Sequence, residues 1–202
     1  MKLSICICTI ETRVAQFSLL KHHLQTQINE FGLQRDVEIL SECDNKQISV
    51  GKKRQNLIEK SKADYVVFVD DDDMIPYYYV QKIIEAIKTT TKPFAYYPPD
   101  CIGFKIECKG TVGKTASASN KWDDWANNVG GFDYVRTIYH KNPVKREIAL
   151  QIGYKDMRFG EDYDYSKRLK ESGLLKEEVF IDEIMYEYRY KFEPHTTKYG
   201  IK

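Results

Sequence analysis

The sequence predicts an α/β fold in which a mostly parallel central sheet is covered by helices on both faces. Strand-like and helix-like segments alternate through the first half of the chain, which is the pattern of parallel strands joined by crossover helices. The segment YVVFV at 65–69 is apolar on both faces, as expected of a strand buried between two layers of helices. A length of 202 residues suits one domain with its own hydrophobic core.

Three strands are predicted in the first half, at 2–10, 36–42 and 65–69, and a helix follows each of them. Each helix is recognised by apolar residues three or four positions apart, or by a run of good helix formers such as 51–63. Gly32 is expected to end the first helix. The apolar stripes are Phe17, Leu20, Leu24, Ile28 and Phe31 in the first helix, and Val80, Ile83, Ile84 and Ile87 in the third.

The second half is less regular. Short β-like pieces at 102–107 and 114–119 precede a polar, aromatic stretch at 121–132, which we interpret as a substrate-facing loop. Helices are predicted at 144–152 and 161–172, the second with Gly173 beyond its end. A last strand with one buried face is predicted from alternating aromatic residues. These aromatic residues are Tyr186, Tyr188, Tyr190 and Phe192.

Composition restricts the classes of partner and compartment. Thirty-one Lys and Arg balance thirty Asp and Glu, so the net charge of +1 gives no reason to expect nucleic acid or an anionic membrane as an obligatory partner. The five cysteines form no C-x-x-C pair, and we see neither a signal peptide nor an apolar run of about 20 residues. We therefore expect a cytoplasmic protein without a transmembrane segment.

Four consecutive aspartates, Asp70 to Asp73, follow the buried strand directly. Ligands of open α/β sheets bind at the carboxyl ends of the strands, where these residues fall. Alternation is expected to send Asp70 and Asp72 to one side and Asp71 and Asp73 to the other. Because close carboxylates destabilise the fold unless a cation lies among them, this D-x-D arrangement predicts a Mg²⁺ or Mn²⁺ site.

An EF-hand loop or a solvated acidic turn would also place aspartates close together. The EF-hand is excluded, because counting from Asp70 gives Ile75 where Gly is required and Gln81 where Glu is required. An acidic turn that begins the next helix is favourable, since Asp stabilises a helix N-terminus. For Asp73 alone such a turn is as well supported as a function, but for four aspartates after a buried strand we favour a metal site.

Two segments together resemble the family 2 glycosyltransferases. In the first, VGKKRQNLIEKSKADYVVFVDDDDMI at 50–75, a Gly, an Arg and an Asn precede an Ala, an apolar strand and D-x-D-D. In the second, NPVKREIALQIGYKDMRFGEDYDYSKRL at 142–169, a Gly-Glu-Asp triplet opens a helix, as it does beside the acceptor in those enzymes. The resemblance implies one GT-A domain over 1–202, with a nucleotide-sugar-binding half at 1–97 and an acceptor-facing half at 98–202.

The resemblance also implies roles for individual residues. Asp72 matches the metal ligand of the D-x-D motif, and Asp70 matches the carboxylate near the ribose and the metal. Asp162 matches the general base of inverting enzymes, with Glu161 beside it to orient the acceptor. A histidine near the C-terminus often serves such enzymes, which makes His195 a candidate third metal ligand. The residues expected around the nucleotide are Thr9, Glu11, Arg13, Asp44, Gly51, Arg54, Asn56, Asp70 and Asp71.

The function implied is transfer of a sugar from a nucleotide sugar, with UDP-sugar favoured, to an acceptor hydroxyl with inversion and with Mn²⁺ or Mg²⁺ as cofactor. The first strand departs from the family pattern, because CTIETR at 8–13 stands where many members have a Pro, an aromatic residue and an Asn. Two further expectations are a sugar platform at Trp122 and Trp125, and a phosphate contact at Lys145 or Arg146.

Three rival functions stay open at the level of sequence. A sugar nucleotidyltransferase shares this kind of sheet, but it normally has a Gly-rich loop after the first strand, and CTIETRVAQF at 8–17 contains no Gly. A metal-dependent phosphodiesterase or nuclease would use Asp70, Asp72 and Asp162 as ligands for two ions. A non-catalytic binding module would keep all its properties when Asp162 is replaced by Asn.

Overall fold

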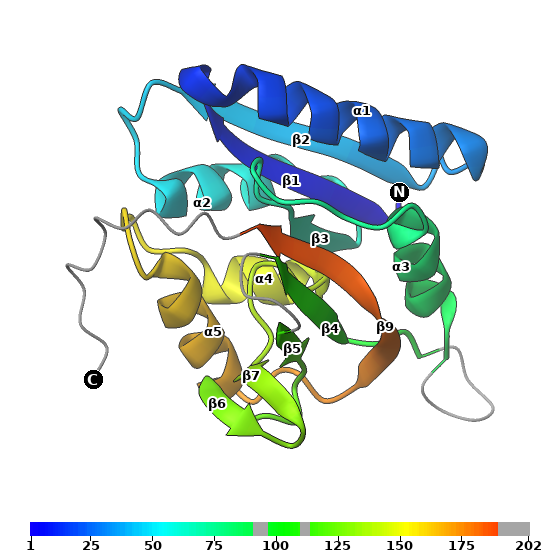
Figure 1. Cartoon of the computed structure of the whole chain (residues 1–202), viewed down its shortest axis with the longest axis vertical. Helices are drawn as coiled ribbons and strands as arrows, with labels where there is room; N and C mark the ends of the chain where they lie inside the picture. The colour runs from blue at the N-terminus through cyan, green and yellow to red at the C-terminus, as the bar shows by residue number, and fades with distance from the viewer. Residues whose placement is uncertain (91–96, 110–113, 190–202) are drawn as a thin grey trace.

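A computed structural model describes residues 1–90, 97–109 and 114–189 of the chain, and Figure 1 shows the arrangement of its elements. Within these residues the strands form one nine-stranded sheet in the order β2-β1-β3-β8-β4-β5-β7-β6, with β9 pairing beside β4. The strands are β1 (Leu3–Ile10), β2 (Val37–Asp44), β3 (Tyr65–Phe68), β4 (Cys101–Lys109), β5 (Lys114–Ala118), β6 (Ala126–Val129), β7 (Phe132–Arg136), β8 (Val144–Lys145) and β9 (Glu178–Arg189). The helices are η1 (Glu11–Arg13), α1 (Val14–Glu30), α2 (Val50–Lys60), α3 (Tyr79–Lys88), α4 (Arg146–Ile152) and α5 (Glu161–Glu171).

The sheet is mixed, so the expectation of a mostly parallel sheet holds only for part of it. β2, β1 and β3 are parallel neighbours, and the crossover helices α1 and α2 connect them. β8 then pairs antiparallel with both β3 and β4, and β4 pairs antiparallel with β5. Short connections, such as the one between β4 and β5, bring strands together in antiparallel order, whereas crossover helices are needed for parallel order.

Helices cover both faces of the sheet, as predicted. On one face, alternate β1 residues such as Leu3 and Ile5 pack in one hydrophobic cluster with the buried stripes of α1 and α3. On the other face, Cys6 and Phe68 pack in a second cluster with apolar residues of α2, α4 and α5. The predicted stripe of α3 is confirmed, because Val80, Ile83, Ile84 and Ile87 are all buried. In α1, Leu20, Leu24 and Ile28 are buried, whereas Phe17 and Phe31 are half-buried, and Phe31 lies just after the last helical residue.

The predicted loop at 121–132 is partly wrong. The hairpin of β6 and β7 begins within it, and Gly130 and Gly131 make the turn with positive φ angles. The hairpin lies beside α5 (Figure 1). Its first strand, ANNV, has no alternating apolar face and is mostly exposed, so the sequence carries no period-2 signal there.

The last strand, β9, begins at Glu178, earlier than the aromatic alternation indicates. Tyr186 is fully buried, but Tyr188 is 38% exposed, so the predicted buried face does not continue along the strand. Tyr190 and Phe192 lie outside the described residues. All five cysteines are free thiols. No helix in the described part of the chain has the length and apolar character needed to cross a membrane.

The first turn of α2 is packed closely against the loop that leads to α5. The Ser49 side chain caps the helix by accepting from the Lys52 amide at 3.0 Å. The Gly51 amide donates to the Met157 carbonyl at 3.1 Å. A Cβ atom on Gly51 would overlap the Lys155 carbonyl oxygen and would lie 3.1 Å from the Met157 amide nitrogen. Only glycine therefore allows this approach, which gives Gly51 a packing role, while the predicted nucleotide contact stays a prediction.

Replacing Gly51 with Ala should lower the melting temperature, because the new methyl group forces the 155–157 loop away from α2. We expect a loss of about 1–3 kcal/mol in the free energy of unfolding, measured by urea denaturation. The exposed neighbour Lys52, changed to Ala, is the matched control and should stay within about 0.5 kcal/mol of wild type. Equal stability of the two variants would contradict the close approach.

Candidate active site

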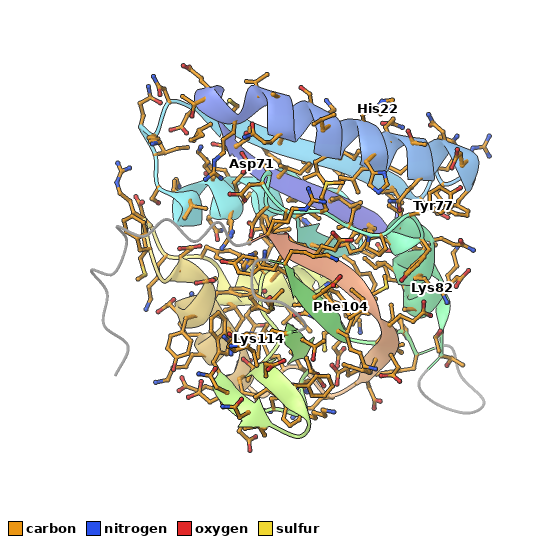
Figure 2. The ribbon with its side chains drawn as sticks, viewed as in Figure 1. His22, Asp71, Tyr77, Lys82, Phe104 and Lys114 are labelled. Carbon is orange, nitrogen blue, oxygen red and sulfur yellow. The ribbon has the colours of Figure 1, made fainter. Side chains whose placement is uncertain are left out.

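The four aspartates occupy a turn after β3, at the carboxyl edge of the sheet, where Asp71 is labelled in Figure 2. The Asp73 amide donates to the Asp70 carbonyl at 3.2 Å, which closes the turn. Because strand alternation stops before the turn, the predicted pairing of side chains is wrong. Asp70 and Asp73 share Lys141, whereas Asp71 and Asp72 share Arg13.

Lys141 is the centre of a buried ionic cluster. Its ammonium lies 2.6 Å from Asp70 Oδ2, 2.6 Å from Asp73 Oδ2 and 3.0 Å from the Tyr186 hydroxyl. The Tyr186 hydroxyl donates to Asp73 Oδ2 at 2.8 Å and accepts from the Asp70 amide at 3.0 Å. Burial by itself would lower the pKa of Lys141, but the two carboxylates raise it above its ordinary value, so the side chain stays charged.

Asp70 is also bound by His140 and Arg54. His140 Nε2 lies 3.2 Å from Asp70 Oδ2, and Arg54 Nη2 lies 3.3 Å from Oδ1. Burial, with the nearby Arg54 charge, lowers the pKa of His140 to about 4, so its ring is neutral near pH 7. Burial would raise the pKa of Asp70, but Lys141 and His140 hold it well below its usual range. Both oxygens of Asp70 therefore contact groups of the chain itself, and its predicted role at the metal stays a prediction.

Arg54 connects the two motifs of the sequence. Its Nη1 donates to Glu161 Oε1 at 2.5 Å, while Nη2 reaches Asp70, and its side chain is only 5% exposed. Its guanidinium carbon also lies 5.6 Å from the centre of the Phe68 ring. Arg54 and Glu161, expected at the nucleotide and the acceptor, are thus occupied with each other. Burial raises the pKa of Glu161, although Arg54 acts to lower it.

Asp71 and Asp72 differ from the other two aspartates in their surroundings. Asp71 is buried, accepts from the Thr9 hydroxyl at 2.7 Å and accepts from Arg13 Nη1 at 2.8 Å. The side chain of Asp72 is 43% exposed, and its Oδ2 lies 3.0 Å from the same Arg13 nitrogen. Partial burial raises the pKa of Asp72, with Arg13 opposing the shift. Asp72 is the aspartate of this turn that is open to a ligand.

Asp72 is the most exposed carboxylate of the turn and the one best placed to hold a divalent ion. Among residues 1–90, 97–109 and 114–189, no group of three or more His, Cys, Asp or Glu side chains is arranged to hold a metal. Mg²⁺ often takes just one or two carboxylates together with substrate phosphates, and the exposed oxygen of Asp72 suits that mode. His195, the predicted third ligand, lies outside the described residues.

Asp44 ends β2 and lies opposite Ile10 at the carboxyl end of β1. Its carboxylate forms an ion pair with Lys53 and accepts from the Ile48 amide at 2.8 Å. The hydrogen bond from Lys53 lowers the pKa of Asp44 to about 2. Lys53 also donates to the Thr9 carbonyl at 2.6 Å, so one buried ammonium ties the ends of β1 and β2 together.

Two more of the predicted nucleotide residues have different surroundings. Asn56 donates its side-chain amide to Glu42 Oε1 at 2.8 Å and thereby connects α2 to β2. Glu11 is exposed in the short turn between β1 and α1. Neither position by itself indicates a nucleotide, so both roles stay predictions.

Asp162 lies in the first turn of α5, which begins after Gly160 in the left-handed conformation. It is half-buried, and its Oδ1 accepts from the Tyr163 amide at 2.8 Å. Trp125 packs edge-on against the Tyr163 ring at 5.3 Å between centroids, and its indole donates to Ser166 Oγ at 3.0 Å. Of the two predicted platform residues, Trp125 therefore lies against α5.

Trp122 belongs to a different neighbourhood. Its indole donates to Ser117 Oγ on β5 at 3.1 Å, and its ring packs edge-on against Phe132 of β7. Lys121 lies over the same ring at 4.5 Å from the centroid. The structure thus makes Trp122 an anchor of the β6–β7 hairpin.

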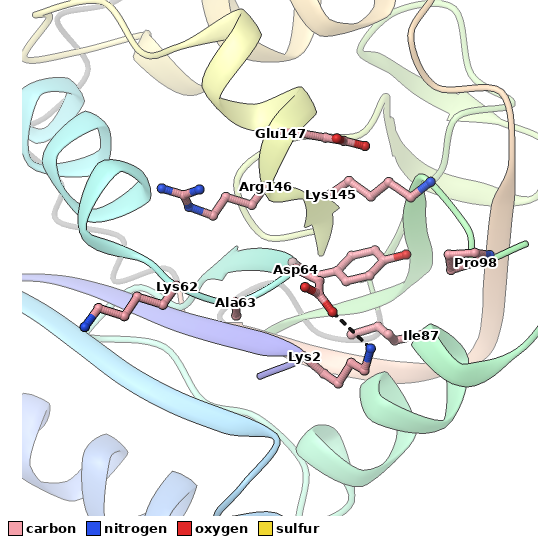
Figure 3. Close-up of a pocket in the computed structure, with 10 residues that line it drawn as sticks. Lys2, Lys62, Ala63, Asp64, Ile87, Pro98, Lys145, Arg146 and Glu147 are labelled. Atoms are coloured by element: carbon pink, nitrogen blue, oxygen red, sulfur yellow. Dashed lines mark hydrogen bonds and ion pairs between the residues drawn. The ribbon is translucent and has the colours of Figure 1, made fainter.

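A pocket of about 490 Å³ lies at the opposite edge of the sheet, at the amino ends of β1 and β3 (Figure 3). Lys145 and Arg146 are among the residues that line it. Lys145 pairs with Asp100 at 2.8 Å, and the Arg146 guanidinium donates to the Ile58 and Glu59 carbonyls at the end of α2. The predicted phosphate contact at these two residues is therefore not part of the aspartate site.

The important residues that the sequence did not reveal are buried cations and their partners. Lys141 and Tyr186 are distant in sequence from the aspartates, and no pattern marks a lysine as buried. Lys53 stands in a charged run, KKR at 52–54, that is typical of a solvated helix face. The usable signal was the excess of negative charge at 70–73, which requires cations from somewhere in the fold.

The sequence matches no family model and no curated protein. Solved structures are nevertheless similar over nearly the whole chain. S. aureus TarS 1–349 in complex with UDP-GlcNAc has a TM-score of 0.65 at 13% identity, over 100% of this chain and 62% of that one. TarS 1–349 in complex with UDP has a TM-score of 0.68 at 13% identity, over 94% of this chain and 61% of that one.

A second neighbour is the catalytic domain of Drosophila β1,4-galactosyltransferase 7 in complex with xylobiose. Its TM-score is 0.52 at 12% identity, over 98% of this chain and 67% of that one. These neighbours are GT-A glycosyltransferases, so the predicted fold is confirmed. The chain spans about three-fifths of the length of the TarS chains that it matches.

Replacing Lys141 with Met should strongly destabilise the protein, because the buried Asp73 loses its ion pair and Asp70 keeps only the one with Arg54 among those described. We expect a loss of about 3–5 kcal/mol, measured by urea denaturation. Lys82→Met is the matched control, since Lys82 pairs with Glu183 on the surface and should lose at most about 1 kcal/mol. Equal losses for the two variants would show that Lys141 does not neutralise the aspartate turn.

Proposed function

We propose that this chain is a glycosyltransferase that moves a sugar from a nucleotide sugar, most favourably a UDP-sugar, to an acceptor hydroxyl with inversion of configuration. The proposal combines the GT-A fold with the arrangement of two carboxylates at one edge of the sheet. In this scheme residues 1–97 bind the donor and residues 98–202 face the acceptor. The TarS complexes with UDP and UDP-GlcNAc support uridine as the nucleoside.

The contact that carries the proposal is the Arg54 bridge. One guanidinium touches Asp70, which begins the D-x-D turn, and Glu161, next to Asp162. The two sequence motifs, about 90 residues apart, are thereby held at a separation set by a single side chain. A donor and an acceptor placed at these motifs would meet beside one another, as group transfer requires.

On the donor side, the diphosphate would lie against the carboxyl ends of β1 and β3. Asp44, at the end of β2, is within reach of a base that lies over β1 and β2. Asp72 is the residue that would hold the divalent ion, together with phosphate oxygens of the donor. When bound, Mn²⁺ or Mg²⁺ supplies Lewis-acid stabilisation of the negative charge on the leaving diphosphate.

On the acceptor side, Asp162 would accept the proton of the attacking hydroxyl. Its carboxylate is half-buried, and α5 holds it in the first turn of the helix. Attack from this side, with the diphosphate leaving toward Asp72, inverts the anomeric centre. Glu161 serves this geometry indirectly, because its bond to Arg54 fixes the first turn of α5.

The site also bears on the rival functions. A two-metal phosphodiesterase needs Asp70 as a ligand, but Lys141, His140 and Arg54 take both oxygens of that carboxylate. A nucleotidyltransferase would need a Gly-rich phosphate loop after β1, where this chain has the 3-10 turn Glu11–Arg13. Neither rival has a supporting observation in the described residues.

The proposal is tested by two variants with different expected results. Asp72→Ala should abolish the rise in melting temperature that UDP causes together with Mn²⁺, because the ion loses its carboxylate. Asp162→Asn should keep that rise but reduce sugar transfer or donor hydrolysis by about 100-fold or more, because the general base is lost. The measurements are thermal shift with UDP and UDP-sugars, with and without chelator, and release of UDP.

Asp182→Asn, at a side chain that is 78% exposed on β9, is the control for loss of one negative charge and should behave as wild type. If Asp162→Asn keeps full activity, Asp162 is not the base. If the wild type binds UDP but shows no turnover, a binding module is the better description. If no nucleotide shifts the wild-type melting temperature under any metal condition, the donor site itself is wrong.

A further inference from the structure

Arg13 pairs with Asp72, the carboxylate that would hold a divalent ion in the proposed function. Its Nη1 lies between Asp71 Oδ1 at 2.8 Å and Asp72 Oδ2 at 3.0 Å. The two carboxylates are not equivalent, because Asp71 is 3% exposed and Asp72 is 43% exposed. Arg13 is thus anchored on a buried carboxylate and reaches an open one.

The anchor is itself fixed. The Thr9 hydroxyl donates to Asp71 Oδ2 at 2.7 Å, so both oxygens of Asp71 are hydrogen-bonded and its orientation is set by β1. The side chain of Arg13 is 42% exposed, and only its Nη1 makes a hydrogen bond or ion pair within the described ranges. Its remaining nitrogens, Nε and Nη2, donate to no acceptor of those ranges and are available to an anion.

Charge considerations explain why Arg13 extends to Asp72. Lys141 neutralises Asp70 and Asp73, and Arg54 adds a further positive charge at Asp70. For Asp72, Arg13 is the only cation within ion-pair distance in the described part of the chain. A divalent ion on the same carboxylate would meet the guanidinium at close range, and the two positive charges would repel each other.

We propose that Arg13 is an exchange cation, which neutralises Asp72 in the free protein and transfers to the donor's diphosphate when a divalent ion takes Asp72. The same nitrogen, Nη1, contacts both carboxylates, so in the exchange it keeps Asp71 while the exposed Asp72 side chain turns from it to the ion, and Nε and Nη2 receive the phosphate oxygens. The inference rests on the proposed function, since it assigns a role within the same donor site.

The exchange has a direct consequence for binding. Without nucleotide, the ion must displace Arg13 from Asp72 with no compensating partner, so the free protein binds metal weakly. With a nucleoside diphosphate present, the displaced guanidinium gains phosphate oxygens, to which its planar donors are well matched. Metal and diphosphate therefore bind together more tightly than either binds alone.

The decisive variant is Arg13→Gln, which removes the charge but keeps an amide that can donate to Asp71. Mn²⁺ binding without nucleotide should become about threefold tighter or more, because the competing cation is gone. UDP binding in the presence of Mn²⁺ should become about tenfold weaker or more, because a charged hydrogen bond to phosphate is lost. Free Mn²⁺ is measured by electron paramagnetic resonance, and UDP binding by calorimetry.

The expected changes in Arg13→Gln are opposite, with tighter Mn²⁺ binding and weaker UDP binding. If Arg13 only stabilised the structure of the site, its loss would weaken the binding of both Mn²⁺ and UDP. Arg13→Lys should keep Mn²⁺ affinity within about twofold of wild type, because the charge remains. Arg35→Gln, at an exposed arginine outside the site, controls for the change in net charge and should alter neither affinity. Melting temperatures of all three variants establish that they are folded.

An Arg13→Gln protein that binds Mn²⁺ no more tightly than wild type overturns the exchange. If wild type shows Asp72-dependent binding of UDP with Mn²⁺ in that experiment, the proposed function stands and only the role of Arg13 fails. If wild type binds neither UDP nor Mn²⁺, both the proposed function and the exchange are wrong.

Discussion

Four carboxylates in one turn after a buried strand form a stable structure only when cations reach them, and this requirement organises the rest of the fold. Lys141 binds Asp70 and Asp73 from the segment before β8, and Arg54 binds Asp70 from α2. Arg13 binds the remaining pair from the turn after β1. Separate elements are thereby fixed to one point, and the removal of any one cation leaves a buried charge with fewer partners.

The same requirement divides the aspartates into framework and ligand-binding groups. Asp70, Asp71 and Asp73 are held by groups of the chain and shape the turn. Asp72 is left open at the edge where a diphosphate would lie. Because Arg54 also binds Glu161, the neutralisation of the turn and the placement of Asp162 depend on one side chain. The Arg54 side chain thereby connects the donor side and the acceptor side of the proposed site.

Part of the site was predictable because it depends on local signals. An apolar run ending in aspartates places Asp72 at the carboxyl edge, and the Gly-Glu-Asp triplet places Asp162 in the first turn of α5. The pairing of the aspartates was predicted wrongly, because it was extrapolated from strand alternation into a turn. Arg54 fits the family motif by position, yet its contacts come from groups 16 and 107 residues away in sequence.

The sequence by itself determined the alternation of helices and strands, the two-sided burial of β3 and the excess of negative charge after it, since each depends on residues close together in the chain. Tertiary structure alone decided which cations meet which carboxylates. The partners of Lys141 lie 45 to 71 residues away, so its burial and charge follow from packing. Tertiary structure also decided that the sheet is mixed. The strand order beyond β3 depends on how the second half of the chain packs against the first, and the local periodicity of a strand does not indicate which neighbour it pairs with.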